Sequence, residues 1–197
     1  MEKRSINFEL RAKPESRTIF GTATVFNSSY DMGWYDEEMS PESLNEADMK
    51  DVVALFNHDM NMVLARTSSG TLKLNVTGNA MEYEFEAPNT TLGNDLLEMV
   101  KRGDVYQSSF AFTVEAEDWQ ERSGMKPKRV IRSIKKVYDV SPVTYPANPD
   151  TMVAKRSYDA TKQIDEDLLK VIEISVKSEI NIQNELRRNA LHLLNLK

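Results

Sequence analysis

The sequence contains no cysteine, and this absence excludes several kinds of chemistry. Disulfides, thiolate metal sites and cysteine nucleophiles all need a thiol. Histidine is almost as scarce, because only His58 and His192 are present. An imidazole base would have to be one of these two residues, and the HExxH spacing of zinc peptidases does not occur. We therefore expect neither a metal nor another cofactor.

Long apolar runs are missing as well. No stretch is long enough to cross a bilayer, and residues 1–17 lack the apolar segment of a secretory signal. We expect synthesis in a cytoplasm and no membrane partner. Basic residues are outnumbered, because 25 Lys and Arg stand against 31 Asp and Glu, for a net charge of −6. A nucleic-acid-binding surface has to neutralise phosphates, so we expect no nucleic-acid partner.

Proline and glycine are absent from the end of the chain, where Pro149 is the last proline and Gly124 the last glycine. From about residue 160, apolar residues recur at helical spacing, in one stripe of Leu169, Ile172, Val176 and Ile180 and another of Leu186, Ala190, Leu193 and Leu194. The pattern predicts a globular domain over residues 1–157 and an amphipathic helical tail over 158–197 that needs a partner surface.

Before this tail, most of the chain reads as β-strands. Residues 19–26, 106–114 and 130–140 are strand candidates, and 52–56 is a short apolar run of strand length. Residues 72–76 and 81–85 alternate between apolar and polar around Thr77-Gly78-Asn79, which predicts a hairpin with one buried face. Helices are fewer: one is expected to start at Ser40-Pro41, and another spans residues 89–102 with Gly103 just past its end. We expect an α+β fold.

Three side chains could carry serine hydrolysis, which needs a hydroxyl, a base and a group that orients the base. His58 follows the apolar run 52–56, whereas His192 lies in a leucine-rich helical segment. Ser109 alternates with Phe110 and is expected on the open face of its strand, while Ser108 would share the aromatic face. Asp139 comes late in a predicted strand, where a carboxylate could orient an imidazole or cap the following turn.

Other interpretations of these residues stay open at this point. His58 could be an ordinary surface or packing histidine, and Ser108 and Ser109 could be two ordinary strand serines. The Gly-x-Ser-x-Gly turn of esterases is absent, which disfavours a general esterase. The pattern Ser-x-x-Lys occurs at Ser123 and again at Ser133, and its repetition in one short basic region makes a serine–lysine site an unconvincing alternative.

Five segments, taken together and in order, resemble the prohead proteases of tailed bacteriophages. They are Trp34, residues 53–59 (VALFNHD), 64–72 (LARTSSGTL), 102–112 (RGDVYQSSFAF) and 139–147 (DVSPVTYPA), within a match over roughly residues 4–155. The resemblance implies His58 as the base, Ser109 as the nucleophile and Asp139 as the third member. Many relatives have methionine at the position of Ser108 and glutamate at that of Asp139.

The resemblance also implies a fold and a role. The family is similar in fold to herpesvirus assemblin, so a mostly antiparallel β-barrel surrounded by helices is expected. The expected activity is a serine endopeptidase that cleaves scaffold or major capsid protein inside the assembling prohead, in the host cytoplasm, with self-cleavage and homo-oligomers as further expectations. Arg66 and the Arg102-Gly103 segment are candidates for stabilising the oxyanion. The alternative is a non-catalytic capsid assembly or scaffolding protein.

Overall fold

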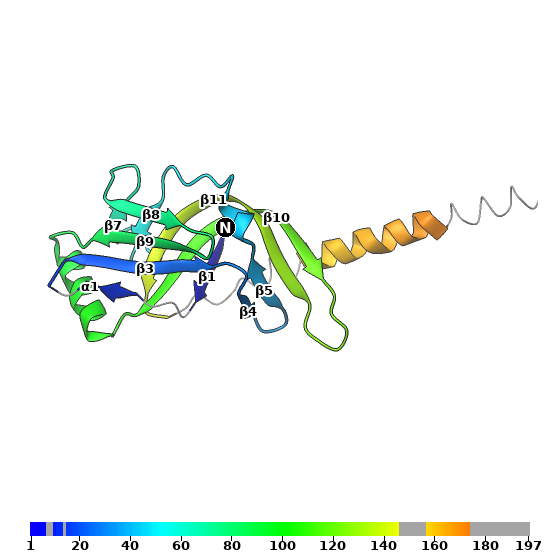
Figure 1. The fold of residues 1–197 in the computed structure, drawn as a ribbon, viewed down its shortest axis with the longest axis horizontal. Helices are drawn as coiled ribbons and strands as arrows, with labels where there is room; N and C mark the ends of the chain where they lie inside the picture. The colour runs from blue at the N-terminus through cyan, green and yellow to red at the C-terminus, as the bar shows by residue number, and fades with distance from the viewer. Residues whose placement is uncertain (7–9, 14, 146–156, 174–197) are drawn as a thin grey trace, which may run out of the picture. The chain divides into compact units, whose positions relative to one another are not determined.

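The structure is a computed structural model, and it describes residues 1–6, 10–13, 15–145 and 157–173. The chain divides into two units, Met1–Thr151 and Met152–Lys197. Figure 1 shows that the first unit is built mainly from strands. The expected α+β class is confirmed, because these strands are accompanied by α-helices.

The first sheet of the described residues has seven strands. They are β1 (Glu2–Ile6), β4 (Ser29–Asp31), β5 (Asp36–Met39), β6 (Val53–Leu55), β7 (Val63–Arg66), β10 (Gln107–Gln120) and β11 (Lys128–Val143). The long strands β10 and β11 form its central antiparallel pair, and β1 adds to the other edge of β10. Because β11 is so long, it pairs in parallel with β5 near its start and with β6 near its end.

The second sheet has four strands in the order β2-β3-β9-β8. Their bounds are β2 (Arg11–Ala12), β3 (Thr18–Val25), β8 (Leu72–Val76) and β9 (Ala80–Glu86). β8 and β9 are the predicted hairpin, closed by a hydrogen bond from the Thr77 amide to the Ala80 carbonyl. This prediction is confirmed, because the period-two pattern of the hairpin places Met81, Tyr83 and Phe85 on one buried face.

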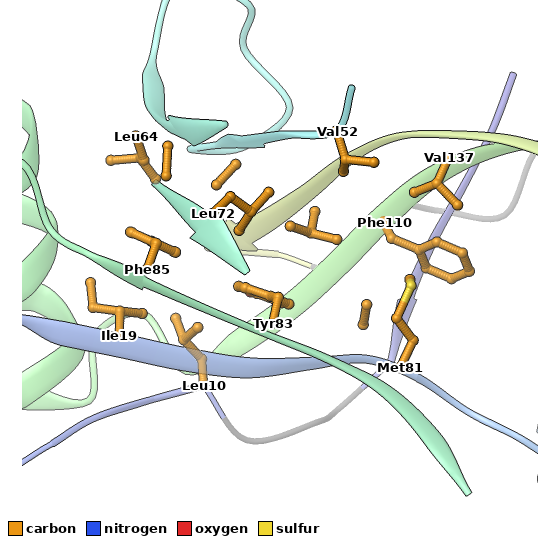
Figure 2. Close-up of a cluster of buried hydrophobic side chains, with 14 of the residues drawn as sticks. Leu10, Ile19, Val52, Leu64, Leu72, Met81, Tyr83, Phe85, Phe110 and Val137 are labelled. Carbon is orange, nitrogen blue, oxygen red and sulfur yellow. The ribbon is translucent and has the colours of Figure 1, made fainter. Parts of the chain in front are cut away.

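One hydrophobic core fills the space between the two sheets (Figure 2). Ile19, Tyr83 and Phe85 enter it from the second sheet, and Phe110 and Val137 enter it from β10 and β11. Each such side chain stabilises the fold by roughly 1.5–3 kcal/mol relative to an exposed position. The core therefore fixes which face of β10 looks inward, and with it the direction of every second side chain.

Helix α1 (Thr91–Arg102) confirms the helix expected over residues 89–102. The Thr90 side chain accepts a hydrogen bond from the Gly93 amide at the first turn, and Gly103 ends the helix in a left-handed conformation with φ of 82°. Gly93 is required by packing, because a Cβ there would lie 2.1 Å from the Pro88 carbonyl oxygen. The helix start expected at Ser40-Pro41 is a short 3-10 helix, η1 (Pro41–Leu44).

The expected closed barrel is wrong. No ladder among the described strands joins the two sheets, whose hydrogen-bonded paths end at β1 and β4 in one and at β2 and β8 in the other. The physical reason is that the sheets stack face to face and share the core through side chains, not through backbone hydrogen bonds. Helices were expected to surround the barrel, but the described part of this unit contains only α1 and the short 3-10 helix η1.

In the second unit, residues 157–173 are helical. Residues 174–197 lie outside the described residues, and so do residues 146–156, which precede the expected boundary after residue 157. The boundary and the extent of the tail therefore stay predictions. Within the described ranges, no helix is both long and apolar enough to span a membrane.

Candidate active site

Ser109 lies on β10, and its side chain points away from the core. Phe110 and Phe112 stack on each other in the core, with ring centroids 4.6 Å apart, so alternation sends Ser109 to the opposite face and Ser108 inward. The two directions are as predicted, but the expectation that Ser109 lies on an open face is wrong. Its exposed fraction is 0%, because other parts of the chain cover that face.

Asp139 and Ser141 lie on β11, directly beside Ser109. In the register of the two strands, Ser141 is opposite Ser109 and Asp139 is opposite Ala111. The next pair is Phe112 with Val137, so Tyr138 is an extra residue in β11. Residues opposite each other in an antiparallel pair share a face, and therefore the Asp139 and Ser141 side chains lie on the face of Ser109.

His58 comes from a tight turn that follows β6. Asn57 and His58 both have positive φ, 54° and 57°, a conformation that few residues other than glycine adopt. The turn is fastened to the end of β11, because the Asn57 amide donates to the Pro142 carbonyl and the Thr144 amide donates to Asn57 Oδ1. Since β6 pairs with β11 at Asp139, this anchored turn brings the imidazole over the carboxylate.

The structure brings the three predicted residues together in one hydrogen-bonded chain. His58 Nδ1 lies 2.6 Å from Asp139 Oδ1, and His58 Nε2 lies 2.6 Å from Ser109 Oγ. A carboxylate only accepts hydrogen bonds, so an ionised Asp139 selects the tautomer with its proton on Nδ1. The lone pair on Nε2 then faces the serine hydroxyl. Such an arrangement can transfer a proton from the hydroxyl to the imidazole.

Ser141 belongs to the same cluster, and the sequence did not single it out. Its hydroxyl donates to Asp139 Oδ1 at 2.6 Å and lies 3.3 Å from His58 Nδ1. Its side chain is fully buried. The only signal in the sequence is its spacing of two from Asp139 in a strand, which is shared by many serines with no such contact.

Ser108 has a different environment. Its hydroxyl lies 2.8 Å from the Tyr83 hydroxyl, inside the core. Burial raises the pKa of Tyr83 well above its usual value, and the nearby Asp139 carboxylate raises it further, while the hydrogen bond to Ser108 offsets only part of this. Tyr83 is therefore neutral at physiological pH, and a neutral phenol is a poor acceptor for the proton of a serine.

The remaining candidates lie elsewhere. Arg66 forms an exposed ion pair with Asp51, and Arg102 forms one with Asp104, so their role at an oxyanion stays a prediction. His192 lies outside the described residues. In the part of the chain that the structure describes, no group of three or more His, Asp or Glu side chains is arranged to hold a metal ion.

A family model described as Caudovirus prohead serine protease matches residues 6–164, which is most of the chain. The match confirms the resemblance seen in the sequence motifs. No curated protein and no solved structure matches the chain. The expected likeness to assemblin therefore stays a prediction.

Proposed function

The chain belongs to the caudovirus prohead serine protease family, and from this premise we propose that it is a serine endopeptidase with Ser109 as nucleophile, His58 as base and Asp139 as the residue that orients the base. The observation that carries this proposal is the pair of 2.6 Å contacts that link the three side chains through the imidazole of His58. Hydroxyl, base and orienting acid are the parts that acyl transfer by serine needs.

The proposed mechanism follows from the order of the three side chains, with the imidazole between the hydroxyl and the carboxylate. His58 Nε2 takes the hydroxyl proton as Ser109 Oγ attacks the carbonyl carbon of the scissile peptide bond. The resulting imidazolium is stabilised by Asp139, and it then donates the proton to the leaving amine. Water, deprotonated by His58 in the same way, hydrolyses the acyl-enzyme and releases the second product.

The choice of Ser109 over Ser108 rests on which hydroxyl has a base. Ser109 contacts an imidazole nitrogen, whereas Ser108 contacts the neutral hydroxyl of Tyr83. Only the first contact can generate a nucleophilic alkoxide near neutral pH. Ser108 is better suited to joining the two sheets, because its partner Tyr83 comes from β9 and its own strand is β10.

We propose scaffold and major capsid proteins as the substrates, cut inside the assembling prohead in the host cytoplasm. Membership of a family of prohead proteases supports this substrate class. Removal of the helical tail by self-cleavage, and assembly into homo-oligomers, belong to the same proposal. Peptide hydrolysis is effectively irreversible in water, so cleavage at this stage would give maturation a direction.

A fluorophosphonate reagent tests the chemistry directly. We expect it to label Ser109 in the wild-type chain and not in a His58→Ala variant, because the reagent needs an activated hydroxyl. Peptide mapping by mass spectrometry identifies the labelled residue. Absence of labelling at Ser109 would contradict the serine protease and favour the alternative, a non-catalytic assembly or scaffolding protein.

Co-expression tests the substrate class in the same system. The wild-type chain, produced with the scaffold and major capsid proteins of its phage, is expected to generate new protein termini that the His58→Ala variant does not generate. Labelling of Ser109 without any cleavage of these two proteins would still support a serine hydrolase but would reject the proposed substrates.

Ser141 is expected to act as a positioning residue for the His58–Asp139 pair. A hydrogen bond to a charged group contributes about 1.5–3 kcal/mol, so Ser141→Ala should lower kcat by roughly ten- to hundredfold. KM should change little, because the Ser141 hydroxyl contacts Asp139 and the Nδ1 side of the imidazole, whereas Ser109 contacts Nε2. Steady-state kinetics on a peptide substrate separates these two effects.

The matched control is Ser133→Ala, which removes a serine from the same strand at a position opposite Ala116. We expect this variant to keep the wild-type kcat. Equal losses of kcat in the two variants, or a loss confined to KM in Ser141→Ala, would reject the positioning role.

A further inference from the structure

Strand β1 lies along the edge of β10 at the position of the proposed nucleophile. Its register places Ser5 opposite Ser109 and Arg4 opposite Phe110. The Ser109 hydroxyl donates a hydrogen bond of 2.9 Å to the Arg4 carbonyl oxygen. Ser109 itself is fully buried. A polypeptide cannot reach a hydroxyl in this position unless a covering part of the chain moves.

The contact with Arg4 also affects the proton that catalysis needs. A hydroxyl carries one proton, so a hydroxyl that donates to the Arg4 carbonyl cannot at the same time donate to His58 Nε2. The backbone of β1 thus competes with His58 for the proton of Ser109.

Buried charges hold β1 in this register. Arg4 contacts Glu37 of β5, with Nη2 and Oε2 2.8 Å apart, and it also contacts Glu2. Glu2 in turn accepts two hydrogen bonds from Arg129 of β11, at 2.7 and 2.9 Å, and Arg129 continues to Glu117 of β10. Burial raises the pKa of Glu2, but the hydrogen bond and charge of Arg129 and the charge of Arg4 outweigh it and leave the pKa lowered.

Glu2 and Arg4 reach these partners only when β1 is in register with β10, whereas Arg129 also contacts Glu37 and Glu117 without any residue of β1. Buried ion pairs of this kind contribute little net stability, and their best-attested use is to fix one register over another. The cluster therefore holds β1 by two of its residues, Glu2 and Arg4, on both sides of Lys3.

We infer that β1 is a built-in cover of the active site, which must separate from β10 near Arg4 and Ser5 before a protein substrate can reach Ser109. The inference rests on the proposed function and adds a way in which access to the same site is regulated. In the covered state, the Arg4 carbonyl holds the hydroxyl proton and β1 blocks access. In the uncovered state, the proton returns to the line between Ser109 and His58.

A reversible cross-link tests the cover. Lys3 and Ala111 are opposite each other in the register of β1 and β10, which is the arrangement that a cross-strand disulfide requires. Because the natural chain has no cysteine, Lys3→Cys with Ala111→Cys creates the only possible intramolecular disulfide. Labelling of Ser109 by a fluorophosphonate and cleavage of a protein substrate scale with the population of the open state, so oxidation should slow both by at least about tenfold. Reduction should restore them.

The matched control carries the same cross-link elsewhere. Lys73 and Glu84 are opposite each other in β8 and β9, and both are exposed enough to be replaced by cysteine. The Lys73→Cys and Glu84→Cys pair should label at the same rate in the oxidised and reduced states. Equal labelling rates for the oxidised and reduced forms of the Lys3→Cys and Ala111→Cys variant, with the cross-link verified by mass spectrometry, would reject the covering role of β1. The serine protease proposal would remain in place.

A second variant does not depend on forming a disulfide. Glu2→Gln removes the charge by which β1 pairs with Arg129 while keeping the length of the side chain, so it should populate the open state and raise the labelling rate several-fold. Hydrogen exchange measures the opening of β1 independently. Faster exchange in β1 without faster labelling would count against the cover. Absence of labelling in every form, wild type included, would instead reject the serine protease itself.

Discussion

Replacement of Ser109 by alanine is expected to lower kcat for peptide cleavage by at least about 10⁴-fold, because no other group can form the acyl-enzyme. The Ser109 side chain adds no bulk to the core, so the variant should fold with an unchanged melting temperature to within a few degrees. Single-turnover kinetics on a capsid-derived peptide, together with thermal unfolding, measures both effects on the same preparation.

Ser108→Ala is the matched control, one residue away on the same strand. This change leaves the Tyr83 hydroxyl without its partner in the core, and an unsatisfied buried polar group costs about 1–3 kcal/mol. We therefore expect the opposite pattern: a lowered stability and a kcat within about tenfold of the wild type. A Ser109→Ala variant that still cleaves, paired with an inactive but folded Ser108→Ala variant, would move the nucleophile to Ser108.

Asp139→Asn is expected to produce the second-largest effect, a decrease in kcat of about 10⁴-fold. The amide is nearly the same size as the carboxylate, but its nitrogen can donate to His58 Nδ1, and the ring proton then sits on Nε2. A proton on Nε2 faces Ser109 Oγ, 2.6 Å away, and the imidazole can no longer accept from it. The loss therefore comes from the wrong tautomer and not from a change in shape.

Two measurements separate this cause from a structural one. The rate of Ser109 labelling should fall in parallel with kcat, and the Asp139→Glu variant, which keeps the negative charge, should be more active than Asp139→Asn. If Asp139→Asn kept the wild-type kcat, Asp139 would have no role in the mechanism, which would then rest on Ser109 and His58 alone.

The sequence predicted the parts of the fold that follow from local periodicity. The β8–β9 hairpin and α1 were recognisable because apolar residues mark one face and turn or capping residues mark the ends. β1 and β5 were missed because their strands are rich in charge: Glu2, Arg4 and Glu37 resemble surface residues until the strands that carry them are brought together. The charge pairing that buries them is non-local, and no window of sequence contains it.

The candidate site was predictable in its members but not in its environment. His58, Ser109 and Asp139 were nominated by strand patterns and family motifs, and the structure places them in contact. Ser141 could not be nominated, because its role depends on the register between β10 and β11. The contact of Ser109 with the Arg4 carbonyl depends on β1, whose position also follows from pairing across more than a hundred residues. The expected barrel had no support from periodicity, which reveals strands but not how sheets close.

Because Tyr138 is an extra residue in β11, residues before and after it that would otherwise share a face lie on opposite faces of the sheet. Beyond it, the odd-numbered Asp139 and Ser141 belong to the site, whereas before it the odd-numbered Val137 belongs to the core. Loss of one residue at this point would exchange the two sets and send the acid into hydrocarbon. A deletion or insertion within residues 137–141 is therefore expected to destroy the site, whereas the turn over residues 121–127 can change in length without this exchange of faces.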